Sequence, residues 1–129
     1  TLIDTSLWIE FFRKQGDLAI KRRLANEITA GTAAFTCPVY FELLSGARPN
    51  ELTDIRQGFS FATRFEFAPD FWLKAGTLEN KLRKIGVTVP RDDLFIAVAA
   101  AEHQLPLACR DKHFTMIQSG FGALRLEEW

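Results

Sequence analysis

The sequence predicts an α/β fold in which a central, mostly parallel β-sheet is flanked by α-helices (α/β/α). Short apolar runs typical of buried strands, such as Leu107-Ala108-Cys109, alternate with longer segments of helical periodicity. In the clearest helical segment, from Phe71 to Ile85, apolar residues recur at steps of four and three. Strands separated by helices imply parallel pairing with both sheet faces covered. The length of 129 residues indicates one domain, spanning residues 1–129.

The first half of the chain is expected to hold two strands and four helices. Thr5 or Ser6 is expected to cap the first helix, and Asp17 the second, after a break at Gly16. Pro38 suits the first turn of the third helix. The expected elements are a strand at 2–3, a helix through 12, a helix between 17 and 31, a strand at 33–35, and helices at 39–45 and 51–60.

The second half is expected to continue the alternation. A strand is predicted at 65–67, followed by the helix at 71–85, which Gly86 ends. The continuous apolar run at 94–101 is assigned to a buried helix, because four alanines and an acidic start favour a helix over a strand. A last inner strand at 107–109 and an edge strand at 123–126 complete the sheet.

Composition narrows the functional classes. A hydrophobic fraction of 47% and a charged fraction of 25% indicate a globular protein rather than a disordered one. The formal net charge is zero, so nucleic-acid binding would depend on local basic patches. Cys37 and Cys109 lack metal-ligand spacing and are interpreted as free thiols. No apolar run reaches the roughly 18–20 residues that span a bilayer, and no basic leader precedes one, so a cytoplasmic protein is expected.

Four acidic residues lie at positions that the predicted α/β fold would bring together into one ligand-binding site. Asp4 follows the first strand, and Asp111 lies two residues after the last inner strand. Asp93 begins the alanine-rich helix, and Glu42 lies within an apolar helical stretch. Strand ends and helix starts meet at one edge of a parallel sheet. Crowded carboxylates there would take up protons unless a hard cation such as Mg²⁺ neutralised them.

Each acid also has an ordinary structural explanation. Asp4 could cap a turn, and Asp93 or its neighbour Asp92 could cap a helix. Asp111 could be a solvated loop residue, and a salt bridge to Arg48 would satisfy Glu42. Only the four acids together favour a metal site.

The segments around these acids resemble the motifs of PIN-domain toxins, the VapC-type ribonucleases of type II toxin–antitoxin systems. Leu2–Ile9 resembles the opening of such proteins, and Phe41–Ala47 resembles a second motif, in which glycine follows the acid by four residues. In Val89–Ala97 two residues separate the acid from an Ile-Ala pair, which selects Asp93 rather than Asp92. The ordered set covers the chain from end to end, and the last motif, Arg110–Phe114, places phenylalanine three residues after its aspartate.

Two positions depart from the pattern of the family. Cys109 stands where these proteins often have threonine, and His113 stands where many carry another aspartate. Asp111 is then the sole acid of its loop. His113 lacks a Cys or His partner, and His103 follows a long helix, so neither histidine is expected to be catalytic.

The resemblance implies a magnesium-dependent endoribonuclease, with Mn²⁺ able to substitute, that leaves a 5′-phosphate and a 3′-hydroxyl. Asp4 and Asp93 would contact the metal most directly, and Glu42 and Asp111 would do so directly or through water. Thr5 and Ser6 would support Asp4 or a water. RNA contacts are expected from a basic rim, although these residues could equally be solvated charges or ion-pair partners of the acids: Arg48, Arg91, Arg110 and Lys112.

The resemblance also implies a cognate antitoxin, a homodimer and a toxin–antitoxin hetero-oligomer. The first helix is apolar on nearly every face, which favours a groove for such a partner. Two alternatives differ in class. A PIN-like domain could bind RNA without cleaving it. A receiver-like signalling domain would need an aspartate ending a middle strand, and Phe65-Glu66-Phe67 offers none.

Overall fold

The computed structural model describes residues 1–129 and contains five strands and seven helices. The strands are β1 (Leu2–Ile3), β2 (Ala34–Thr36), β3 (Thr63–Phe65), β4 (Leu107–Cys109) and β5 (Leu126–Glu128). The helices are α1 (Thr5–Phe12), α2 (Leu18–Thr29), α3 (Cys37–Gly46), α4 (Leu52–Phe59), α5 (Phe71–Lys84), α6 (Arg91–Glu102) and α7 (Lys112–Gly120). None of the helices combines the length and apolar character that crossing a membrane would require.

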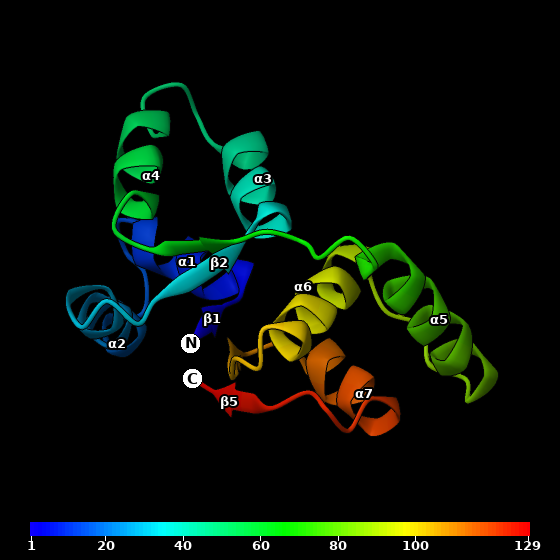
Figure 1. The fold of residues 1–129 in the computed structure, drawn as a ribbon. Coiled ribbons are helices and arrows are strands. Elements are labelled where there is room, and N and C mark those ends of the chain that lie inside the picture. Colours follow the sequence, from blue (N-terminus) through cyan, green and yellow to red (C-terminus); the bar gives the residue numbers. More distant parts are fainter.

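The five strands form one sheet in the order β3-β2-β1-β4-β5, with every neighbouring pair parallel. The predicted α/β class is therefore confirmed. Figure 1 shows α1 to α4 grouped toward one end of the molecule and α5 to α7 toward the other. The chain adds strands on one side of β1 and then returns to add β4 on its other side, so the strand order reverses between β1 and β4. Such switch points hold the ligand-binding crevice of open parallel sheets.

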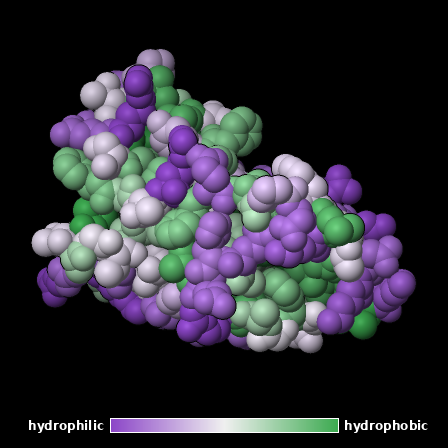
Figure 2. Space-filling view, viewed as in Figure 1, coloured by the Kyte–Doolittle hydropathy of each residue, from purple (hydrophilic) through white to green (hydrophobic).

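A single apolar core of 29 buried residues fills the space between the sheet and its helices. Trp8, Phe71 and Phe114 are its largest fully buried side chains and come from three helices distant in sequence. Some large apolar side chains remain outside, among them Phe41 and Trp72, which are 68% and 62% exposed. The face drawn in Figure 2 shows hydrophobic surface interrupted by hydrophilic residues.

Two strands were predicted at the wrong place, and one helix was missed. The third strand lies at Thr63–Phe65 rather than 65–67, because Phe67 leaves the sheet to stack on Phe71 with ring centroids 3.7 Å apart. The last strand lies at Leu126–Glu128 rather than 123–126, since its partner β4 pairs with it only from Leu126 onward. Helix α7 was not predicted at all.

Candidate active site

The four acids meet beyond the carboxyl ends of β1 and β4, at the switch point of the sheet. Leu2 pairs with Leu107 and Ile3 with Ala108, so Asp4 leaves β1 beside the end of β4, where its amide donates to Ala108 O at 3.0 Å. Burial raises the pKa of Asp4, and the nearby charge of Asp111 adds to the rise. Residues from both halves of the chain therefore face one another across this crevice.

Asp4 is the most buried of these acids, with 3% of its surface exposed. It is the N-cap of α1, a position predicted for Thr5 or Ser6, and that prediction was wrong. Ser6 instead donates to Asp4 twice, from its amide at 3.2 Å and from Oγ at 2.7 Å, both to Oδ2. Burial raises the pKa of the Asp4 carboxyl, and the Ser6 hydrogen bonds oppose that rise by stabilising the anion.

Glu42 joins the site from α3 and accepts a hydrogen bond from the hydroxyl of Thr5 at the start of α1. Burial raises the pKa of Glu42, and the charges of Asp92 and Asp4 raise it further. The salt bridge to Arg48 considered from the sequence is not formed. Thr5, which directly follows Asp4, thus sets the position of the Glu42 carboxylate.

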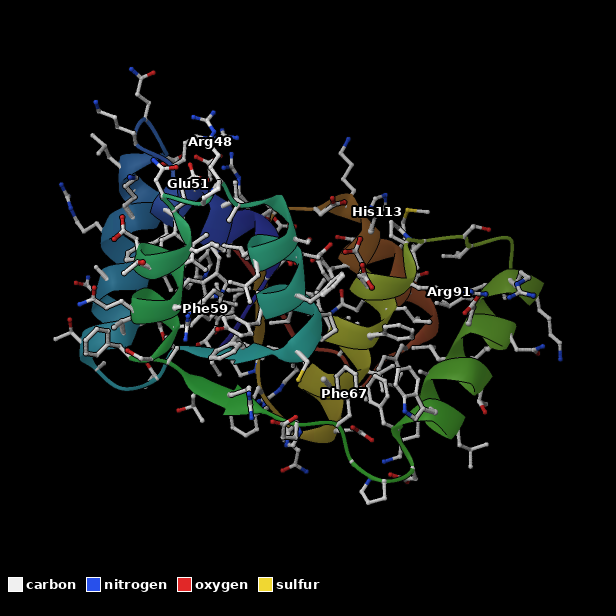
Figure 3. The ribbon with its side chains drawn as sticks, turned by 90° about the horizontal axis from the view of Figure 1, so that it is seen from above. Arg48, Glu51, Phe59, Phe67, Arg91 and His113 are labelled. Carbon is white, nitrogen blue, oxygen red and sulfur yellow. The ribbon has the colours of Figure 1, made fainter.

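Asp93, Asp111 and His113 form the tightest part of the site. His113 Nδ1 lies 2.9 Å from Asp93 Oδ2 and 3.0 Å from Asp111 Oδ1. The ligand atoms of the three residues all lie within 4.8 Å of one another. Burial raises the pKa of Asp93 to about 6, the charge of Asp4 adds to the rise, and the His113 contact opposes it. Figure 3 shows His113 between α6 and α7.

From the sequence, His113 was not expected to be catalytic because it lacks a Cys or His partner, and helix α7, which carries it, was not predicted. Asp111 is the N-cap of that helix and accepts from the His113 amide at 2.9 Å, so the ordinary explanation of Asp111 as a solvated loop residue is incomplete. The sequence did contain a signal for this helix: an aspartate that can act as N-cap, followed at helical spacing by the apolar residues Phe114 and Ile117. Asp93 is not a helix cap either, because Pro90 is the N-cap of α6 and Asp93 lies in the first turn.

His103 has the structural role that its place suggested. It is the C-cap of α6, and its Nε2 lies 2.9 Å from Glu66 O. Its ring packs against Phe65 with centroids 4.6 Å apart. Nothing connects it to the acids.

The predicted basic rim contains one cation that is held in an ion pair, Arg91, and three that are free of ion pairs, namely Arg48, Arg110 and Lys112. Arg91 pairs with Glu79 of α5 at 3.3 Å, so its charge is already engaged, though not by one of the acids. Figure 3 shows Arg91 on the side toward α5 and Arg48 beside Glu51 on the opposite side. No ion pair holds the side chain of Arg48, and its backbone amide donates to Glu51 Oε2 at 2.8 Å.

Arg110 and Lys112 are the other predicted rim cations. Both are exposed, form no ion pair, and flank Asp111 in sequence. They remain available to an anionic ligand entering the crevice.

A groove of about 540 Å³ adjoins the acids between α1, α3 and α4. Apolar side chains from all three helices line it, including Ile9, Phe12 and Ile55. Glu42 lines the same groove, which therefore reaches from the site outward along α1. The apolar side chains of α1 are thus only partly buried in the core, and some of them line this groove.

The donor set suits a hard divalent cation. Crowded carboxylates with raised pKa values lack a counter-charge, and oxygen ligands are those that Mg²⁺ prefers. Asp93 and Asp111 present oxygens close enough to share one ion. Asp4 adds a buried oxygen whose charge acts on the same group.

Comparison with known proteins gives a consistent result. The model of the PIN domain matches residues 1–118. Two relatives are each 34% identical over 124 residues and 90% of both chains: "VapC ribonuclease Mb1587" of Mycobacterium bovis and "Ribonuclease VapC11" of Mycobacterium tuberculosis. Among solved structures, that of VapBC2 from Rickettsia felis bound to a promoter DNA fragment has a TM-score of 0.82 at 19% identity, covering 99% of this chain and 97% of that one.

Proposed function

Because this chain belongs to the PIN-domain family, and within it to the VapC ribonucleases, we propose that it hydrolyses RNA phosphodiester bonds with Mg²⁺ held by its four acids. Asp4 and Asp93 hold the cation most directly, while Glu42 and Asp111 complete the site or orient its waters. One observation carries the assignment. Burial, followed by the charge of Asp4, raises the pKa of Asp93 to about 6, and a divalent cation would offset the cost of keeping these carboxylates ionised together.

The chain contributes positioning and charge. When bound, the cation acidifies the attacking water and offsets negative charge developing on the phosphate. Ser6 fixes one face of the Asp4 carboxylate, and Thr5 fixes that of Glu42. The oxygens that remain then point in constant directions during turnover. Attack by water on phosphorus yields a 5′-phosphate and a 3′-hydroxyl.

Cleavage by the parent and by Asp4→Asn tests this function. Asparagine can still cap α1 but withdraws the charge, so the cleavage rate should fall by about 100-fold or more. Asp17→Asn is the matched control, because Asp17 caps α2 away from the acids. Equal cleavage by Asp4→Asn, or products ending in 2′,3′-cyclic phosphate, would contradict the proposal. Absence of any cleavage by the parent would favour the silent RNA-binding alternative, whereas membership of the family removes the receiver-like one.

We also assign the protein the toxin role in a pair with an antitoxin, working in the cytoplasm. The groove along α1 is the proposed binding site of the antitoxin, because apolar side chains such as Ile9, Phe12 and Ile55 line it among charged ones and Glu42 lines it as well. An occupant would therefore also obstruct the acids. Ile9→Asp should abolish recovery of a small partner with the tagged chain, whereas Leu18→Asp, on the exposed face of α2, should not. Recovery that is equal for both variants would place the partner elsewhere.

A homodimer would use a different surface. On α5, Trp72 and Leu73 are 62% and 75% exposed, and Trp72 packs edge-on against Phe95 near the start of α6. Large exposed apolar side chains of this kind are typical of interfaces. Trp72→Glu should convert a dimer to a monomer in analytical ultracentrifugation, and an unchanged mass would exclude this surface.

A further inference from the structure

His113 occupies the space between two of the proposed metal ligands. It is the second residue of α7, and the capping bond from its amide to Asp111 fixes its backbone. Its ring is 38% exposed, whereas the side chain of Asp93 is only 18% exposed. The imidazole is therefore nearer to solvent than the carboxylate of Asp93.

The donor atoms have the spacing of a coordination polyhedron. In an octahedral site with ligand bonds of about 2.1 Å, neighbouring donors lie about 3.0 Å apart. Nδ1 lies 2.9 Å from Asp93 Oδ2 and 3.0 Å from Asp111 Oδ1. One cation can therefore replace a proton shared among these three atoms with little movement of the side chains. Asp4 lies close to these three residues, because its charge acts on Asp93, and it is only 3% exposed.

We infer that His113 is a direct nitrogen ligand of the cation, and that the site consequently prefers a first-row transition ion such as Mn²⁺ to Mg²⁺. This inference rests on the proposed function for the existence of the metal site. Mg²⁺ favours oxygen donors throughout, whereas imidazole suits transition ions. An aspartate at this position would complete an all-oxygen site. Histidine replaces one of those oxygens with nitrogen and so changes which ion fits.

The experiment uses Mn²⁺ as the probe and the whole chain, in the parent, His113→Asp, His113→Asn and His103→Asn. Electron paramagnetic resonance measures bound Mn²⁺ and its displacement by Mg²⁺. Electron spin echo modulation reports ¹⁴N nuclei bound directly to the ion. His103→Asn is the matched control, because that histidine contacts Glu66 O and not the acids. Circular dichroism confirms that each variant is folded.

The parent and His103→Asn should show ¹⁴N modulation, and both His113 variants should lose it. His113→Asp should lower the Mn²⁺-to-Mg²⁺ affinity ratio by at least about tenfold. Bound Mn²⁺ that supports cleavage without ¹⁴N modulation would show that His113 only orients the aspartates through hydrogen bonds. That result, or an unchanged affinity ratio in His113→Asp, overturns the inference and leaves the proposed function standing. A parent that binds neither ion overturns both.

Discussion

Replacing Asp93 with asparagine should stabilise the protein when divalent cations are absent. Burial, followed by the charge of Asp4, raises the pKa of Asp93 from 3.8 to about 6. Between these values the folded protein keeps a proton that the unfolded chain has released. The free energy of unfolding therefore falls as the pH rises through this window, and the loss is complete above about pH 6. Asparagine removes the loss because an amide carries no charge.

The size of the effect follows from the same pKa. A rise of about two pH units corresponds to about 3 kcal/mol, at about 1.36 kcal/mol for each unit. Partial exposure of the Asp93 side chain, 18%, and the weakened contact with His113 reduce this figure. We expect a net gain of about 1–2 kcal/mol near neutral pH, which corresponds to roughly 3–8 °C in Tm.

Urea and thermal unfolding of the parent and Asp93→Asn in EDTA measure this gain. The difference should disappear below about pH 3, where Asp93 is protonated in both the folded and the unfolded state. Adding Mg²⁺ should stabilise the parent more than the variant, because the parent binds the ion more tightly. A variant that is less stable than the parent at neutral pH in EDTA, or a difference that does not change with pH, would refute the reasoning that burial and the charge of Asp4 make ionised Asp93 destabilising when no cation is bound.

Three further predictions concern other parts of the structure. Ser6→Ala should lower the free energy of unfolding by about 1–2 kcal/mol, measured in urea, because a buried carboxylate loses its 2.7 Å hydroxyl donor. Gly16→Ala should lower the free energy of unfolding by about 2–4 kcal/mol in the same assay, because the added Cβ would overlap a backbone carbonyl of α1. Gly76→Ala should raise it by about 0.5–1 kcal/mol, because the Cβ at this position of α5 would meet no other atom. Arg48→Glu should weaken RNA binding and reduce the slope of its salt dependence by about 1. Arg91→Glu should weaken RNA binding less, because that guanidinium already pairs with Glu79. Equal effects of the two substitutions would remove the distinction between held and free cations.

Local patterns were sufficient for most of the fold. The helix at 71–84 could be read from its apolar spacing, and Asp17 identified the start of α2 as its N-cap, because periodicity and capping depend on residues close in sequence. Strand β3 could not be read in this way. Its Thr63 and Arg64 are exposed at the sheet edge and carry no apolar signal. Only pairing with β2 shows that they form a strand.

The sequence by itself determined which acids stand at strand ends and helix starts, and the parallel class of the sheet then brought Asp4 and Asp111 to one edge. Only the tertiary structure decided that His113 lies between two carboxylates and that Thr5 donates to Glu42. The physical reason is distance along the chain. Capping and periodicity act over a few residues, whereas these contacts join side chains 20 and 37 residues apart and form only when the helices pack.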